Sequence, residues 1–105
     1  MEKPSMIIST YPTKVTADRA ISHLVGERLA ACANIIQISS TYWWGGKMEQ
    51  AGEYLVIYKT TQKNKKILQE QIAKHHPYDT PEIAEIDVTS INDSYMQWLV
   101  DSTTL

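Results

Sequence analysis

The sequence predicts an α+β fold of the ferredoxin-like type, a β-α-β-β-α-β sandwich followed by one more helix. Two observations lead to this prediction. Strand-like segments and segments with helical apolar spacing follow one another in that order. A Gly-Gly pair joins the two middle strands as a tight hairpin. The 105 residues suit a single domain over residues 1–105, because a second hydrophobic core would have too little chain.

The first strand and the first helix are separated by a proline. Residues 5–11 are rich in β-formers and end before Pro12, which cannot donate a hydrogen bond to a sheet. Thr13 or Thr16 can then cap a helix, and apolar residues at helical spacing extend the predicted helix from about residue 16 to residue 31. In this prediction Cys32 lies at the helix end among alanines, where a buried and inert thiol is expected.

Two long strands follow as a hairpin. Residues 33–44 are β-branched and then aromatic, and residues 48–60 form the returning strand. Gly45 and Gly46 between them readily take the positive φ of a two-residue turn. Because strands of about twelve residues exceed the usual five or six, the hairpin is expected to outrun the other strands and to offer a free edge for pairing.

The second half of the chain predicts a helix, a short strand and a last helix. Residues 62–76 have helical spacing and end before Pro77, which stops a helix. Residues 82–88 alternate as a strand, with Ala84 and Ile86 on one face and Glu85 on the other. The predicted apolar helix faces consist of Ile67, Leu68, Ile72 and His75, and of Ile91, Tyr95, Trp98 and Leu99.

The sheet is expected to have one face that the first two helices do not cover. Right-handed crossovers place both helices on the same side. In residues 54–58, however, large apolar side chains alternate onto both faces. Burying each of them is worth roughly 1.5–3 kcal/mol, so we expect a homo-oligomer held by sheet faces and hairpin edges. Ligand binding in an open cleft is the competing account.

Composition excludes several classes of protein. Ten Lys and Arg against twelve Asp and Glu give a net charge of −2, which offers no electrostatic reason to bind nucleic acid or an anionic membrane. A single Cys excludes an internal disulfide framework and a multi-cysteine zinc cage within one chain. Three Trp, six Tyr and no Phe suit rings that are half-buried at an interface. No signal-peptide core or membrane span is apparent, so the cytoplasm is the expected location.

The most specific string is HHPYDTPEI, residues 75–83. Imidazole is a common ligand of copper and zinc, so His75 and His76 are candidate metal ligands that would need a third ligand from elsewhere. The alternative is that His75 is simply packed at the end of its helix. His76 precedes Pro77, which biases its backbone toward an extended conformation.

Charged and aromatic residues form a second candidate site. A pocket between subunits would be lined by Lys47, Glu49, Lys59, Tyr78, Glu82 and Trp98. The alternative is that the strand charges prevent aggregation or form cross-strand pairs. No phosphate-binding loop, nucleophile elbow or HExxH motif is present, so the sequence predicts no enzyme and no organic cofactor.

Several strings together resemble the CutA family of divalent-cation tolerance proteins: ERLAACANI, YWWGGKMEQAGEYLVIYKTT, HHPYDTPEI and YMQWL, from about residue 7 to residue 99. The resemblance implies a compact, unusually stable homotrimer with the architecture of the nitrogen-regulatory PII proteins. It also implies copper binding by a cysteine near the end of the first strand together with a His pair. The pair matches His75 and His76, but the cysteine position falls on Ser9. A serine hydroxyl is a poor copper ligand, which leaves a site of histidine alone or of histidine and water.

Two hypotheses follow. The first is a cytoplasmic homotrimer that binds Cu(II) or another divalent transition metal through His75 and His76 and takes part in metal tolerance. The second is a PII-like signalling or interaction scaffold with a small-molecule pocket at the subunit interface.

Overall fold

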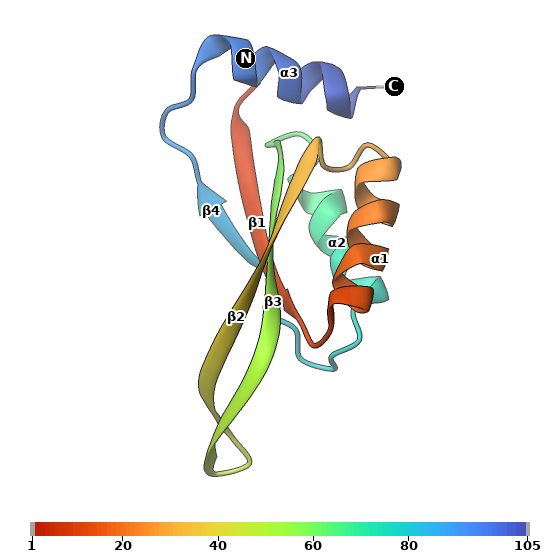
Figure 1. Cartoon of the computed structure of the whole chain (residues 1–105). Helices are drawn as coiled ribbons and strands as arrows, with labels where there is room; N and C mark the ends of the chain where they lie inside the picture. Colours follow the sequence, from red (N-terminus) through yellow and green to blue (C-terminus); the bar gives the residue numbers. More distant parts are fainter. Residues whose placement is uncertain (1, 105) are drawn as a thin grey trace.

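The computed structural model describes residues 2–104, and its strands form one antiparallel sheet in the order β2-β3-β1-β4. The elements are β1 (Pro4–Tyr11), α1 (Lys14–Gly26), β2 (Cys32–Trp44), β3 (Lys47–Thr61), α2 (Lys65–His75), β4 (Ala84–Asp87) and α3 (Asp93–Thr103) (Figure 1). This is the predicted order of elements, and the ferredoxin-like α+β prediction is confirmed.

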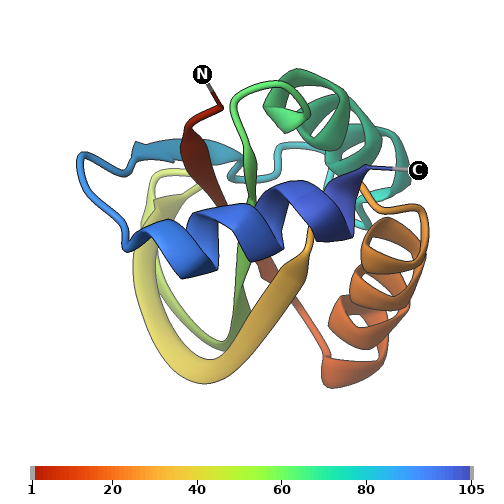
Figure 2. The ribbon, with the colours of Figure 1, turned by 90° about the horizontal axis from the view of Figure 1, so that it is seen from above.

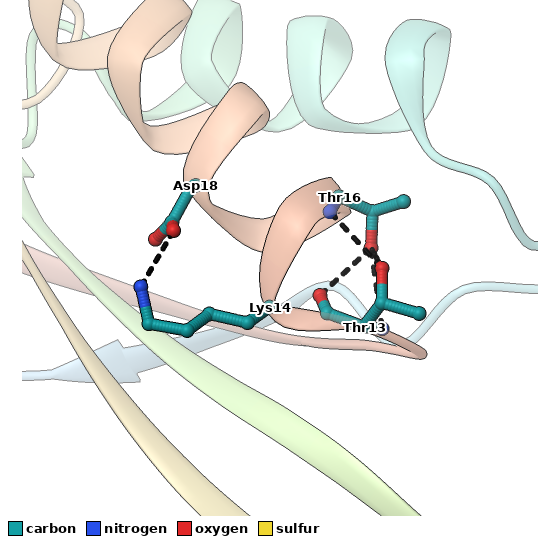
Figure 3. Close-up of polar contacts among 4 residues, drawn as sticks. All are labelled: Thr13, Lys14, Thr16 and Asp18. Atoms are coloured by element: carbon teal, nitrogen blue, oxygen red, sulfur yellow. Dashed lines mark hydrogen bonds and ion pairs between the residues drawn. The ribbon is translucent and has the colours of Figure 1, made fainter.

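Helix α1 begins at a capping box formed by two threonines (Figure 3). Thr13 has an extended backbone, and its Oγ1 accepts a hydrogen bond from the Thr16 N–H at 3.1 Å. The Thr16 Oγ1 in turn accepts a hydrogen bond from the Thr13 backbone N–H at 3.3 Å. Of the two predicted caps, Thr13 is therefore the N-cap, and the capping box satisfies the N–H groups of Thr13 and Thr16.

The end of α1 differs from the prediction, because the helix stops at Gly26 and not near residue 31. Arg28 adopts a φ of 61°, in the left-handed region. The Leu29 N–H then reaches back to the Leu24 carbonyl at 3.1 Å. A left-handed residue that lets the next N–H groups satisfy the last helical carbonyls is a common way for a helix to end.

Cys32 consequently opens β2, and its predicted place at the end of a helix is wrong. The Ala31 N–H donates to the Lys59 carbonyl at 2.9 Å, and this contact aligns the following residues with β3. Cys32 pairs with Lys59 in the sheet and is half-buried. The alanines before Cys32 favour a helix only through their local conformational preference. Pairing with a strand almost thirty residues away in sequence outweighs this preference.

The hairpin of β2 and β3 outruns the rest of the sheet, as predicted. Gly45 and Gly46 form its turn with φ values of 58° and 78°, as a hairpin of this type requires. Strand β1 pairs with β3 only from Tyr54 to Thr61. Residues 47–53 of β3 therefore pair with β2 alone, and this part of the hairpin extends past the helices (Figure 1).

Helices α1 and α2 cover one face of the sheet and bury the core (Figure 2). The core side chains come from alternate positions of β1 and β3 and from the inner sides of the helices: Ile7, Tyr11, Leu24, Val56, Tyr58, Leu68 and Ile72. Ile67 was predicted to share the buried face of α2 but is 49 % exposed. It directly precedes the buried Leu68, and one residue turns a side chain by about 100° around the helix. His75, predicted on the same face, is also exposed.

The opposite face of the sheet, here called the open face, is apolar. It carries Met6, Ile8, Ile36, Ile38, Leu55, Ile57 and Ile86. Ile36 is 46 % exposed and Ile86 is 43 % exposed. Helix α3 lies across one end of the molecule, away from the hairpin turn (Figures 1 and 2). It covers only that end, where the ammonium group of Lys59 lies 6.0 Å from the centre of the Tyr95 ring.

Strand β4 is shorter than predicted, and the carboxylate of its Glu85 points toward the helices. Glu85 pairs with Ile7 on the helix side of the sheet and accepts hydrogen bonds from Lys65 at 2.8 Å and Gln69 at 3.3 Å. The alternation of β4 is therefore as predicted, but its apolar residues face away from the core of the subunit.

Candidate functional site

His76 lies directly after α2 and has an extended backbone with φ −77° and ψ 139°, as predicted for a residue before proline. Its ring turns toward the end of β1. It stacks on the ring of Tyr11, with centroids 4.5 Å apart and planes inclined by 20°. The ring of Tyr78 lies on another side at 5.3 Å. The half-buried imidazole thus packs against two tyrosine rings and the end of β1.

Both ring nitrogens of His76 have partners. Nε2 lies 2.9 Å from the Thr10 carbonyl oxygen and 3.1 Å from Ser9 Oγ. Nδ1 accepts a hydrogen bond from the Tyr78 backbone N–H at 3.1 Å. Because a backbone carbonyl can only accept, Nε2 carries the proton and the ring is the neutral tautomer with a proton on that nitrogen. Burial lowers the pKa of His76, while the Thr10 carbonyl and Glu53 act in the opposite direction.

Ser9, at the position where the family resemblance places a cysteine, is fully buried. Its hydroxyl contacts His76 Nε2, and that nitrogen has no lone pair free for a metal in this tautomer. Ser9 and His76 as arranged therefore do not fit a copper ion, because one offers a hard hydroxyl and the other has both nitrogens engaged.

His75 points elsewhere. Its ring lies between α2 and α1, against His23 of α1, with ring centroids 5.1 Å apart. Both side chains are exposed. The structure thus places the two adjacent histidines in different surroundings. Over residues 2–104, no cluster of three or more His, Cys, Asp or Glu side chains is arranged to hold a metal ion. The His75 and His76 metal pair stays a prediction.

Beside His76, two buried tyrosines share a hydrogen bond that no local sequence signal predicted. The Tyr11 and Tyr58 hydroxyl oxygens are 2.6 Å apart, and both side chains are buried in the core. Burial raises the pKa of both hydroxyls, so each stays protonated and each can donate as well as accept. Alternation along β1 and β3 places the two side chains on the same face of the sheet. Only the register between the two strands brings their hydroxyl groups together.

Tyr78 and Glu82, two of the six predicted pocket residues, line one cavity of about 480 Å³. The Tyr78 hydroxyl donates to Glu53 at 2.8 Å, and the pKa of Tyr78 is raised, first by burial and then by this carboxylate. Lys47 and Glu49 lie far along the hairpin, next to its turn. Of the other two predicted residues, Lys59 contacts α3 and Trp98 belongs to α3.

The cavity is also lined by residues outside the six predicted ones. Its wall includes the hairpin rings Tyr42 and Trp44 and the carboxylates Glu53 and Asp79. Glu53 is only 9 % exposed. The available signal was a carboxylate directly before the apolar run of residues 54–58, because a buried charge requires a partner such as the Tyr78 hydroxyl.

Comparison with known proteins decides the family. The family profile described as CutA1 divalent ion tolerance protein matches residues 5–102. The chain belongs to the CutA1 family. The predicted resemblance is confirmed, and the match covers all of the sheet and the helices except Pro4 and Thr103 at their ends. The family's description concerns tolerance of divalent ions and names no catalysed reaction.

Related CutA proteins match over nearly their full length. The divalent-cation tolerance protein CutA of Pyrococcus horikoshii is 39 % identical over 98 residues, which is 93 % of this chain and 96 % of the relative. The protein of the same name from Thermotoga maritima is 39 % identical over 97 residues, with 92 % and 96 % of the two chains covered.

Solved CutA1 structures share the fold. The crystal structure of divalent ion tolerance protein CutA1 from Ehrlichia chaffeensis superposes with a TM-score of 0.96 at 39 % identity, covering 100 % of this chain and 99 % of the other. A structure from Archaeoglobus fulgidus, described as a periplasmic divalent cation tolerance protein CutA, gives 0.93 at 31 % identity, with 96 % and 99 % covered. The long hairpin and the added helix α3 are therefore features of CutA1 chains.

Proposed function

We propose that this chain binds divalent transition metal ions, with Cu(II) preferred, and serves metal-ion tolerance as a cytoplasmic homotrimer without catalytic activity. The observation that carries the proposal is the exposed imidazole of His75 in a CutA1 chain. Imidazole is a ligand for copper and zinc, and Cu(II) is bound most tightly among the divalent ions of the first transition row. Within residues 2–104, no hydrogen bond engages the ring nitrogens of His75.

His76 would join His75 only after releasing the Thr10 carbonyl and the Tyr78 N–H, because a metal needs a free nitrogen lone pair. The two histidines therefore make separable contributions, and single substitutions distinguish them.

The open face and the hairpin support self-association. On the open face Ile36 and Ile86 are 46 % and 43 % exposed, and Trp43 near the hairpin turn is 75 % exposed. A partner that buries these surfaces stabilises the assembly through the hydrophobic effect. The single free Cys32 suits a reducing compartment. No helix among the described residues is both long and apolar enough to cross a membrane. Because one relative is described as periplasmic, cell fractionation with an antibody tests the location.

Calorimetric titration of the metal-free protein with CuCl₂ tests metal binding. We expect His75→Ala to weaken binding by at least about tenfold, whereas Lys74→Ala, at an exposed neighbouring position on the same helix, leaves it unchanged. His76→Ala shows whether the predicted pair acts together. Equal affinity of the wild type and the His75→Ala/His76→Ala double variant would contradict the histidine assignment.

A PII-like scaffold that binds a small molecule is the second candidate, and the cavity beside Tyr78 favours it. Glu53, Asp79 and Glu82 line this cavity together with the Tyr42 and Trp44 rings. Three carboxylates and two aromatic faces suit a ligand with a positively charged amine. A thermal-shift screen of cellular amines should find a compound that stabilises the wild type but not Glu53→Gln. The absence of any stabilising compound would count against this function.

A further inference from the structure

Three histidines are present, and the structure pairs two of them that are far apart in sequence. His23 lies in the last turn of α1 and His75 in the last turn of α2. Their ring centroids are 5.1 Å apart and their planes are inclined by 73°. Both side chains are exposed, so a metal ion and its water ligands can reach them.

The separation suits one shared metal ion. An ion bound to an imidazole nitrogen at about 2.0–2.1 Å lies about 3.2 Å from the centroid of that ring. Two rings with centroids 5.1 Å apart can then share an ion with an angle of about 105° at the metal. This angle lies between the square-planar and tetrahedral values. The rings lie edge to face, so binding an ion requires rotation of the two exposed side chains about χ1 and χ2 that turns one nitrogen of each ring toward it.

The surroundings also suit a cation with bound water. The two histidines line a cavity of about 340 Å³ between α1 and α2, and Gln71, one turn before His75, lines it as well. Each imidazole lies at the C-terminal end of its own helix, where the partial negative charge of the carbonyl groups favours a cation. Arg19 also lines the cavity, and its positive charge disfavours a bound cation.

We propose that His23 and His75 together form a two-imidazole Cu(II) site on the helix layer, completed by water. The proposal rests on the proposed function, since it names the ligands of the metal that the chain binds. It differs from the predicted His75 and His76 pair in its second ligand and in its place on the molecule. The helices cover the face opposite the open face, so assembly through the open face leaves the site accessible.

Two measurements on the full chain test the pair. Calorimetry with CuCl₂ should give binding to the wild type that His23→Ala and His75→Ala each weaken by at least about tenfold. The double variant should lose little more than either single variant, because one ligand alone holds the ion poorly. Electron paramagnetic resonance should show two coordinating imidazole nitrogens in the wild type and one in each single variant.

Controls separate a binding effect from a folding effect. Lys74→Ala should bind Cu(II) as the wild type does, and all variants should keep the wild-type circular dichroism, since the exchanged side chains are exposed. If His23→Ala binds as tightly as the wild type while His75→Ala does not, the pair is wrong and metal binding by the chain stands. If the wild type binds no Cu(II), Ni(II) or Zn(II), both the pair and the proposed function are wrong.

Discussion

The imidazole of His76 holds three segments together at the end of the sheet. It stacks on Tyr11, bonds to the Thr10 carbonyl and accepts the N–H of Tyr78. These contacts join β1, the end of α2 and the loop that carries Tyr78. The bond from the Tyr78 N–H requires an unprotonated Nδ1, and burial disfavours the charged ring, so protonation of His76 opposes the folded state although the Thr10 carbonyl favours it.

The stability of the metal-free protein should therefore fall in mild acid. Burial lowers the pKa of His76 below its usual 6.5, so below that pH the unfolded chain binds more protons than the folded one. The contribution of His76 to stability is complete above about pH 6.5 and is lost as the pH falls through the folded pKa. Urea unfolding in EDTA at about pH 7.5 and about pH 5.5 measures the loss. His76→Gln should lose less over this interval, and an equal loss in both proteins would contradict the prediction.

The Tyr11 and Tyr58 pair leads to a second prediction at this scale. Tyr58→Phe leaves the buried Tyr11 hydroxyl without its 2.6 Å partner, and should lower the free energy of unfolding by about 1–3 kcal/mol. The Tyr11→Phe/Tyr58→Phe double variant should lose less than the sum of the single variants, because no orphan hydroxyl remains. Denaturant unfolding of the four proteins gives the coupling energy, and strict additivity would show that the two hydroxyls do not interact.

Among the elements, α1 has the most completely defined ends. The capping box at Thr13 and Thr16 begins the helix, and the left-handed Arg28 ends the turn that follows it. An exposed ion pair between Lys14 and Asp18 at 2.6 Å adds little, since both partners are solvated (Figure 3). The start of α1 therefore depends mainly on the threonine hydroxyls.

Thr13→Ala should lower the free energy of unfolding by about 1 kcal/mol. It removes the acceptor for the Thr16 N–H and leaves that donor without a side-chain partner. Thr13→Ser keeps the hydroxyl and should stay close to the wild type. Thermal unfolding followed by circular dichroism compares the three proteins, and equal midpoints for Ala and Ser would show that the cap is unimportant.

On the scale of the whole molecule, the subunit has one covered and one uncovered side. Helices α1 and α2 enclose the core, whereas the open face and the end of the hairpin expose large apolar side chains. A partner chain of the same kind would cover both surfaces, because the overhanging strands offer an unpaired edge as well.

Substitution on the open face should dissociate the proposed trimer. Light scattering should give about three times the subunit mass of 11.9 kDa for the wild type, and Ile36→Lys should shift the mass toward one subunit because it places a charge in the interface. Ile67→Lys is the matched control, since Ile67 is 49 % exposed on α2 against 46 % for Ile36. A monomeric wild type, or an Ile36→Lys variant with the wild-type mass, would contradict the arrangement.

Local signals predicted most of the fold. The Gly45-Gly46 turn, the cap at Thr13 and the order of the strands and helices follow from residues a few positions apart. The His75–His76 string also stood out as a candidate site. The direction of each imidazole ring could not be predicted, because two residues that are adjacent in the chain can have different surroundings in the fold.

Only the tertiary structure decided where α1 ends, which side of the sheet takes Glu85 and where each imidazole points. Pairing with β3 draws Cys32 into a strand, and Lys65 and Gln69 hold Glu85 on the helix side. His75 continues α2 and meets His23, while the extended backbone of His76 turns its ring toward β1. Each of these depends on contacts between segments distant in sequence, which local spacing does not encode.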